Sequence, residues 1–289
     1  IDGVGQLTGR HYPDGSRATF QYDELGNRTL MADSTGRYTS TYDVLSRIKT
    51  IENPHNKKIT YAYNSVSLRS SMVVLDGGRF TYSYNANNQI TALVNPQTER
   101  TSYAYDVADR RILKKLANGT RTSISYDAAD QQIVIANLKS DSTTISSFRY
   151  SYDNVGNQTL IIDKSGTPTT WSYDVASQLT REERSGTNSY DNSYVYGPTG
   201  NRLVKIESGS RTTTIYDAAN QICYSEDATG RTTFTFDANG NQKVVETPSG
   251  GKTTTTWDYE NQPTIVQKPD NNRITSVYNA DNRRIRKEL

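Results

Sequence analysis

Aspartates recur along this chain in one repeated phrase, and residues of this type could supply acid–base pairs or calcium ligands. Nine of them directly follow an aromatic residue: Asp23, Asp43, Asp106, Asp127, Asp153, Asp174, Asp217, Asp237 and Asp258. Nonapeptide calcium repeats require Gly-Gly-x-Gly-x-Asp, and EF-hand loops require their own spaced oxygen ligands. Neither pattern occurs in the sequence. We therefore predict that these aspartates make turns and bind no metal.

Few other residues are candidates for catalysis. His11 and His55 stand beside turn residues, which is typical of histidines in surface loops, and Cys223 is the only cysteine. One cysteine excludes an intrachain disulfide and a Cys-rich metal site, and a nucleophile would need a base held next to it. The sequence has no phosphate-binding loop of the form Gly-x-x-x-x-Gly-Lys. It therefore predicts no catalytic, cofactor-binding or metal-binding residues, no cofactor, and a protein that is not an enzyme.

An internal repeat positions the aspartates. We call the aromatic residue directly before the aspartate position the anchor of each repeat. Successive anchors are 20 to 26 residues apart. The thirteen anchors are Tyr22, Tyr42, Tyr63, Tyr84, Tyr105, Tyr126, Tyr152, Tyr173, Tyr196, Tyr216, Phe236, Trp257 and Tyr278. We predict that residues 1–289 form a single array of thirteen repeats. Because the chain begins at Ile1 with neither an initiator Met nor a signal peptide, we expect a segment of a larger protein.

Two positions of each repeat predict a tight turn. The residue after the anchor is Asp in nine repeats, Asn in three and Gly in one. The residue four after the anchor is always Gly, Asn, Asp or Ser. Asp and Asn side chains accept hydrogen bonds from their own main chain, and Gly or Asn tolerates the positive φ that closes a hairpin with a bulge. Ser tolerates positive φ less well, so we expect distorted or differently closed turns at Ser46, Ser67 and Ser177.

The segments between these turns have the pattern of β-strands. In eight repeats a second aromatic residue stands two before the anchor, which places both rings on one face of a strand. Thr-rich runs such as Arg211–Tyr216 suit strands, and we find no helical periodicity. A second turn, for example at Asp76–Gly78, joins successive hairpins. The predicted fold class is all-β: tandem two-stranded β-hairpins forming a long antiparallel sheet that curls, because sheets twist, into a partial spiral shell.

The composition favours order without a thick core. Hydrophobic residues make up 33% of the chain and the mean hydropathy is −0.78, yet the chain has 21 tyrosines and a net charge of only +2. Disordered chains are poor in aromatic residues and strongly charged. The balanced charges create no field that attracts nucleic acid, and we interpret the basic terminus Arg283–Leu289 as a solvated strand. No apolar run approaches the ~18 residues of a membrane helix, so we expect neither a nucleic-acid partner nor membrane insertion.

Three stretches resemble the YD repeat of Rhs-type proteins: Phe20–Thr29, Tyr150–Thr159 and Phe234–Lys243 follow the phrase aromatic-x-aromatic-Asp-x-x-Gly-Asn. The stretches Thr256–Thr264 and Tyr278–Glu288 look like bacterial family members near the end of the repeat array. The resemblance covers all thirteen units and implies a spiral β-sheet strip that forms a hollow shell. Similar proteins include polymorphic toxins, insecticidal toxin complexes, wall-associated bacterial proteins and the animal teneurins. In toxins the shell ends in an aspartyl self-cleavage segment, but Asp-Pro-x-Gly-x-x-Asp-Gly is absent here, so no cleavage residues carry over.

The resemblance implies a non-catalytic shell or scaffold segment of a large secreted or surface bacterial protein, which encloses or presents a toxin or other cargo. Its partners would be the remainder of the parent YD-repeat shell and the cargo domain. The alternative is a cell-surface adhesion module or self-assembling fibre that binds carbohydrate or protein through exposed tyrosines and self-associates through open sheet edges. Two insertions, Leu138–Phe148 and Ser185–Tyr194, are the loops where we expect a partner to bind.

Overall fold

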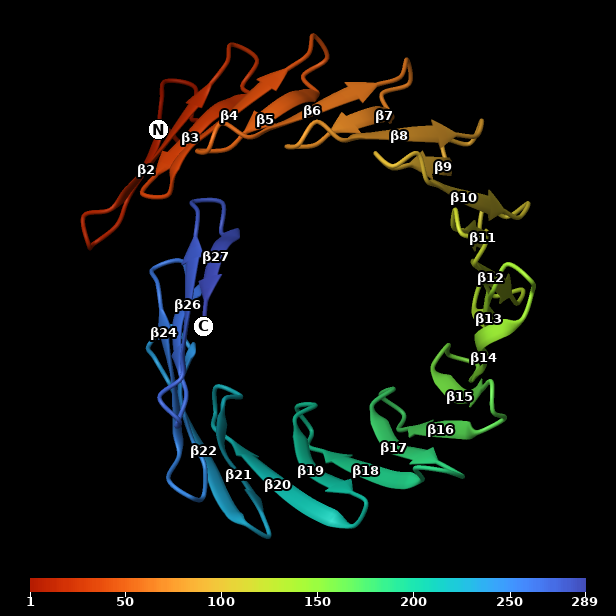
Figure 1. The fold of residues 1–289 in the computed structure, drawn as a ribbon. Helices are drawn as coiled ribbons and strands as arrows, with labels where there is room; N and C mark the ends of the chain where they lie inside the picture. The colour runs from red at the N-terminus through yellow and green to blue at the C-terminus, as the bar shows by residue number, and fades with distance from the viewer. The chain divides into compact units, whose positions relative to one another are not determined.

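Strands account for every regular element of the computed structural model, which describes residues 1–289. The 27 strands belong to one sheet, and consecutive strands pair antiparallel. Figure 1 shows neighbouring strands following one another in chain order, joined by short turns. The predicted all-β class of tandem hairpins is thus confirmed. The chain has no helix long and apolar enough to cross a membrane.

The strands are short and similar in length. The first fourteen are β1 (Gly9–His11), β2 (Arg17–Tyr22), β3 (Arg28–Asp33), β4 (Gly36–Tyr42), β5 (Ile48–Glu52), β6 (Lys58–Tyr63), β7 (Arg69–Val73), β8 (Arg79–Tyr84), β9 (Ile90–Val94), β10 (Arg100–Tyr105), β11 (Arg111–Lys115), β12 (Arg121–Tyr126), β13 (Gln132–Leu138) and β14 (Thr144–Tyr152). The other thirteen are β15 (Gln158–Asp163), β16 (Pro168–Tyr173), β17 (Leu179–Arg184), β18 (Tyr190–Tyr196), β19 (Arg202–Glu207), β20 (Ser210–Tyr216), β21 (Ile222–Asp227), β22 (Gly230–Phe236), β23 (Gln242–Glu246), β24 (Lys252–Trp257), β25 (Pro263–Gln267), β26 (Arg273–Tyr278) and β27 (Arg284–Glu288).

The chain divides into two compact units. The first comprises Ile1–Ser102 together with Thr256–Val266 and Arg273–Leu289, and the second comprises Tyr103–Thr255 and Gln267–Asn272. The first unit therefore joins both ends of the sequence. The repeat pattern continues through both units, and a single array over residues 1–289 remains a prediction.

The first turn of each repeat has the predicted geometry. In the β2–β3 hairpin, the Gly26 amide donates to the Asp23 carbonyl (3.0 Å) and the Asp23 amide donates to the Asn27 carbonyl (2.9 Å). The strand register shifts between Gln21 and Tyr22, so a bulge forms at the anchor. All thirteen residues four after an anchor have positive φ, as the sequence predicts.

The residue after the anchor makes the predicted Asx-turn. The Asp23 Oδ1 atom accepts hydrogen bonds from the Leu25 amide (3.0 Å) and the Asn27 amide (2.8 Å). The same pair of bonds forms in twelve of the thirteen repeats. Gly197 is the exception because it has no side chain to accept them. These carboxylates and amides therefore hold the backbone of the turns.

The expectation of distorted serine turns is wrong. Ser46, Ser67 and Ser177 adopt φ values of 56°, 64° and 58°, and their turns close with the same two backbone hydrogen bonds as the glycine turns. Each serine hydroxyl also has a partner in the preceding repeat: the donors are Asn27 Nδ2 (3.1 Å), Arg47 Nη1 (3.0 Å) and Asn157 Nδ2 (3.1 Å), respectively. A hydrogen bond between repeats thus accompanies the strained backbone at each of these serines.

Anchor tyrosines link each hairpin to the one before it. The Tyr63 hydroxyl donates to the Ile48 carbonyl (2.8 Å), and Tyr63 is one of eight anchor tyrosines that make such a bond. In β6 the rings of Tyr61 and Tyr63 are half-buried while Ala62 between them is exposed, so both rings lie on one face as predicted. Since few side chains in the whole chain are buried, these repeated polar contacts carry much of the cohesion between hairpins.

The insertion at Leu138–Phe148 lengthens a hairpin. β13 has seven residues and β14 has nine, and they pair up to Leu138 and Thr144. A turn of the usual kind joins them, with the Lys139 amide donating to the Thr143 carbonyl (2.8 Å). The expected loop is therefore wrong here, because the added residues find antiparallel partners. The insertion at Ser185–Tyr194 is a turn followed by the start of β18.

Candidate functional site

The aspartates considered for chemistry are occupied within their own turns. Arg47 donates to Asp43 and Arg110 donates to Asp106, and these side-chain hydrogen bonds lower the pKa of both carboxyl groups. Such carboxylates stay ionised at neutral pH and are poor proton donors. His55 is exposed, its amide bonded to the Asn53 side chain.

The remaining candidates lie apart from one another. His11 is exposed at the end of β1, and Cys223 is a half-buried free thiol in β21. The structure places no group of three or more His, Cys, Asp or Glu side chains where they could hold a metal ion. The prediction that the chain has no catalytic, cofactor or metal residues stays a prediction.

A seam in the first unit brings together residues that are far apart in the sequence. Arg28 forms a bidentate pair with Asp281, 253 residues away, through Nη1–Oδ1 and Nη2–Oδ2 distances of 2.7 and 2.5 Å. Arg10 pairs with Glu260 across 250 residues at 3.1 Å. A paired arginine–carboxylate fork fixes orientation as well as adding energy. We call these contacts and their neighbours the seam.

Ordinary repeat elements position the seam residues. Arg28 begins β3, and Asp33 ends it, while Ala280 and Asp281 occupy the turn between β26 and β27. Because the Asx-turn leaves the amide of its second residue without an internal partner, the Ala280 amide donates instead to Asp33 Oδ2 (2.7 Å). Asp33 Oδ1 meanwhile accepts from the Thr35 amide (2.8 Å). One carboxylate thus bridges two turns.

The apolar part of the seam is the best-packed region of the chain. Ala18, Phe20 and Met31 are buried on β2 and β3, and Ala280 packs against this cluster. The Arg28 guanidinium lies 5.5 Å from the centre of the Phe20 ring. The small side chain of Ala280 therefore fits a socket on the sheet face, with the arginine–carboxylate pair at its border.

A second turn contacts the same region. The rings of Tyr12 and Tyr259 stack with a centroid distance of 6.4 Å and an interplanar angle of 22°. Tyr259 follows Asp258 in the turn between β24 and β25. The first turns of the last two repeats thus both lie against the first hairpins, with an aromatic stack in one case and an apolar socket in the other.

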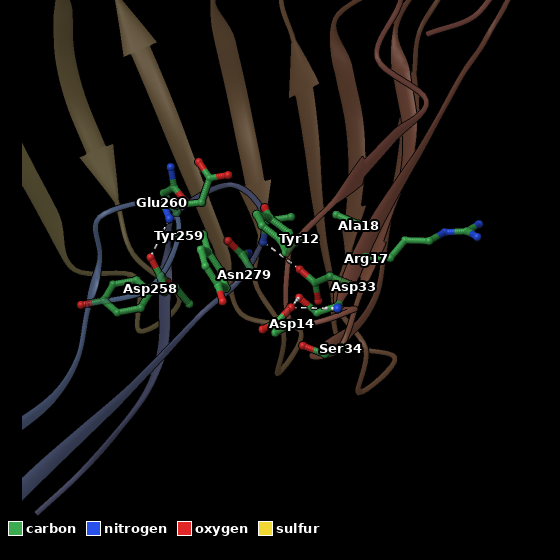
Figure 2. Close-up of a pocket in the computed structure, with 14 residues that line it drawn as sticks. Tyr12, Asp14, Arg17, Ala18, Asp33, Ser34, Asp258, Tyr259, Glu260 and Asn279 are labelled. Atoms are coloured by element: carbon green, nitrogen blue, oxygen red, sulfur yellow. Dashed lines mark hydrogen bonds between the residues drawn. The ribbon is translucent and has the colours of Figure 1, made fainter. Parts of the chain in front are cut away.

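A cavity of about 180 Å³ lies along the seam. In Figure 2, Tyr259 and Asn279 face Tyr12 and Asp33 across it, while the Arg17 side chain points away. Its carboxylates are engaged: Glu260 pairs with Arg10, Asp33 bridges two turns, and Asp14 Oδ1 accepts from the Ser16 hydroxyl (2.7 Å), which lowers the Asp14 pKa. The arrangement is suited to joining hairpins and has no paired acid and base.

The sequence did not single out any residue of the seam. Arg28, Asp33, Ala280 and Asp281 occupy positions that look like those of any other repeat. A usable signal was the apolar run Leu30–Ala32, because consecutive apolar residues place apolar side chains on both faces of a strand, and both faces then need cover.

Comparisons with known proteins agree with the fold. A family model described as Teneurin YD-shell matches residues 2–167, more than half of the chain. The crystal structure of TcdB2-TccC3-Cdc42 superposes with a TM-score of 0.71 and 14% identity, covering 99% of this chain and 16% of that chain. The crystal structure of TcdB2-TccC3 superposes with a TM-score of 0.69 and 12% identity, covering 100% of this chain and 20% of that chain. This chain thus spans a fifth or less of the length of either of these two chains. No curated protein matches its sequence.

Proposed function

Because the chain belongs to the Teneurin YD-shell family, we propose that it is a non-catalytic part of the wall of a larger β-sheet shell. The shell would enclose or present a toxin or other cargo, and its partners would be the remaining YD repeats and that cargo. The predicted resemblance to YD-repeat proteins is confirmed by the family match. Secretion or display at the bacterial surface forms part of the same proposal.

The seam is the observation that carries the proposal. A wall needs lateral contacts between hairpins that are distant in the sequence, in addition to the ladder between successive strands. The Arg28–Asp281 pair and the Ala280 socket are contacts of that kind, made entirely by repeat elements. The similarity in fold to the chains of TcdB2-TccC3 supports the same role.

The alternative adhesion role has less support. An adhesin would display its aromatic rings for a ligand, but eight anchor hydroxyls are bonded to backbone carbonyls. Tyr259 is the only tyrosine with an exposed side chain, at 57% exposure, and it stacks on Tyr12. The rings therefore serve contacts between hairpins.

Imaging of the full-length protein that contains this chain tests the proposal. Single particles should be hollow, with a wall one sheet thick, and a cargo domain inside them should resist protease until the shell is unfolded. An extended fibre or a solid particle would contradict the shell role. A hydrolase activity that is lost on Asp106→Asn, with the fold intact, would contradict the non-catalytic role.

A further inference from the structure

The outermost position of the first turn is apolar in most repeats. This position stands two residues after the anchor, and we call the residue there the tip. Ten of thirteen tips are aliphatic, proline or aromatic: Val44, Ala86, Val107, Ala128, Val175, Pro198, Ala218, Ala238, Tyr259 and Ala280. Turns favour Gly, Asn, Asp, Ser and Pro for backbone reasons. Valine offers none of these advantages, so its recurrence at one position calls for another cause.

The seam supplies that cause for two tips. Ala280 packs on the buried cluster of Ala18, Phe20 and Met31, and Tyr259 stacks on Tyr12. Each of these tips contacts hairpins far away in the sequence. The other eight apolar tips are exposed, and Val44 is 94% exposed. The tip thus packs on a distant hairpin at Ala280 and Tyr259 and is exposed, or bare, at the other eight apolar positions.

We propose that the bare tips dock on the sheet face of YD hairpins from the rest of the parent protein, as Ala280 docks on β2 and β3. The partner is a hairpin of the same repeat type, with a face of small and aromatic side chains. This inference rests on the proposed shell role, because it requires further repeats to lie beside this segment. The row of bare tips is then the surface that contacts those further repeats.

At five of the eight bare tips the next residue is apolar, which favours an apolar contact. Val44 precedes Leu45, Val107 precedes Ala108, and Leu45 is 62% exposed. In the seam, by contrast, Ala280 precedes Asp281, which pairs with Arg28. The partner face for the bare tips therefore needs apolar area rather than an arginine.

Substitutions at the tips test the inference by comparing two forms of the protein. Val107→Asp and Val175→Asp place a charge at the second residue of a type I turn, a position compatible with most residues. The isolated 289-residue chain should keep its Tm, because both side chains are exposed in it. The full-length protein should melt at a lower temperature than its unsubstituted form. Asn154→Asp is the matched control, since it adds the same charge at a tip that is already polar.

Thiol labelling gives a second readout. In a Cys223→Ser background, the thiol of Val175→Cys should react quickly with a maleimide in the isolated chain and slowly in the full-length protein. Equal reactivity in both forms, or equal Tm losses for Val107→Asp and Asn154→Asp, would overturn the inference. Imaging separates the two proposals: hollow particles with reactive tips defeat only this inference, whereas particles that are not hollow defeat the shell role.

Discussion

Eight anchor tyrosines each join two hairpins through one hydroxyl. The Tyr84 hydroxyl donates to the Arg69 carbonyl at 2.8 Å, and partial burial raises the Tyr84 pKa, so the donor stays protonated. Eleven of thirteen anchors are tyrosine. Phenylalanine would supply the same ring without the bond. The hydroxyl therefore explains why tyrosine is the usual residue at the anchor.

Removing one such hydroxyl should lower stability measurably. Tyr63→Phe deletes the bond to the Ile48 carbonyl and keeps the ring, so the free energy of unfolding should fall by about 0.5–1.5 kcal/mol. Tyr61→Phe is the control, because the Tyr61 ring stacks with Arg69 but its hydroxyl holds no neighbouring carbonyl. Urea denaturation followed by circular dichroism measures both. Equal losses for the two variants would show that the anchor bond contributes nothing.

A branched side chain should not fit the fourth residue of the turn. Gly156 has φ of +93°, and a Cβ there would lie 3.3 Å from Gln131 Nε2. Gly156→Val should therefore cost upward of about 1 kcal/mol of unfolding free energy. Gly156→Asn should cost less, because Asn88 adopts positive φ at the same position. If both variants have the same Tm as the unsubstituted chain, the turn assignment is wrong.

At the scale of the hairpin, arginines staple consecutive repeats. Arg110 donates to Asp106 Oδ2 (2.8 Å) in its own turn and to Asp130 Oδ1 (2.7 Å) in the next turn, and it lies 4.8 Å from the Tyr126 ring centre. Arg47 repeats the arrangement over Tyr63. One side chain thus closes its own hairpin and holds the next one in place.

These staples predict acid sensitivity. Hydrogen bonds from Arg47 and Arg110 lower the pKa of Asp43 and Asp106 in the folded state, so their stabilising effect is complete above the unfolded pKa of ~3.9. It is lost as the pH falls below that value. Tm should therefore be nearly constant from pH 7 to about 5 and should drop toward pH 3. Asp106→Asn should flatten part of this drop in a calorimetric pH series, and an unchanged pH profile would contradict the role of Asp106.

The sequence was most informative where geometry is local. Asp23 and Gly26 predict their turn because the side chain and backbone of five residues decide it. Ser46 was judged wrongly because its hydroxyl bonds to Asn27 of the preceding repeat, a partner that lies outside the turn. The Arg28–Asp281 pair could not be predicted at all. The pair depends on which hairpins the turn after β26 packs against. Because every repeat carries similar residues, the sequence does not distinguish this turn from the others.

For the molecule as a whole, the seam determines whether the two ends of the chain stay together. Ala280→Glu would bring a carboxylate against Asp33 and the buried Phe20, so the seam should open. Hydrogen exchange of the β26–β27 amides should then speed up. Ala238→Glu makes the same change at an exposed tip and should leave exchange unaltered. Slow exchange in both variants would mean that the socket does not need a small residue.

The claim that hairpins from opposite ends of the sequence pack tip to face is tested most directly by one distance measurement. Double electron–electron resonance would measure the distance between spin labels on Ser34→Cys and Arg283→Cys in a Cys223→Ser background. Ser34 lines the seam cavity, and Arg283 follows Asn282, which also lines it. We predict a single narrow distribution at short distance, which broadens and lengthens on Ala280→Glu. A broad distribution at long distance in the otherwise unchanged chain would contradict the seam and, with it, the lateral contact on which the proposed wall depends.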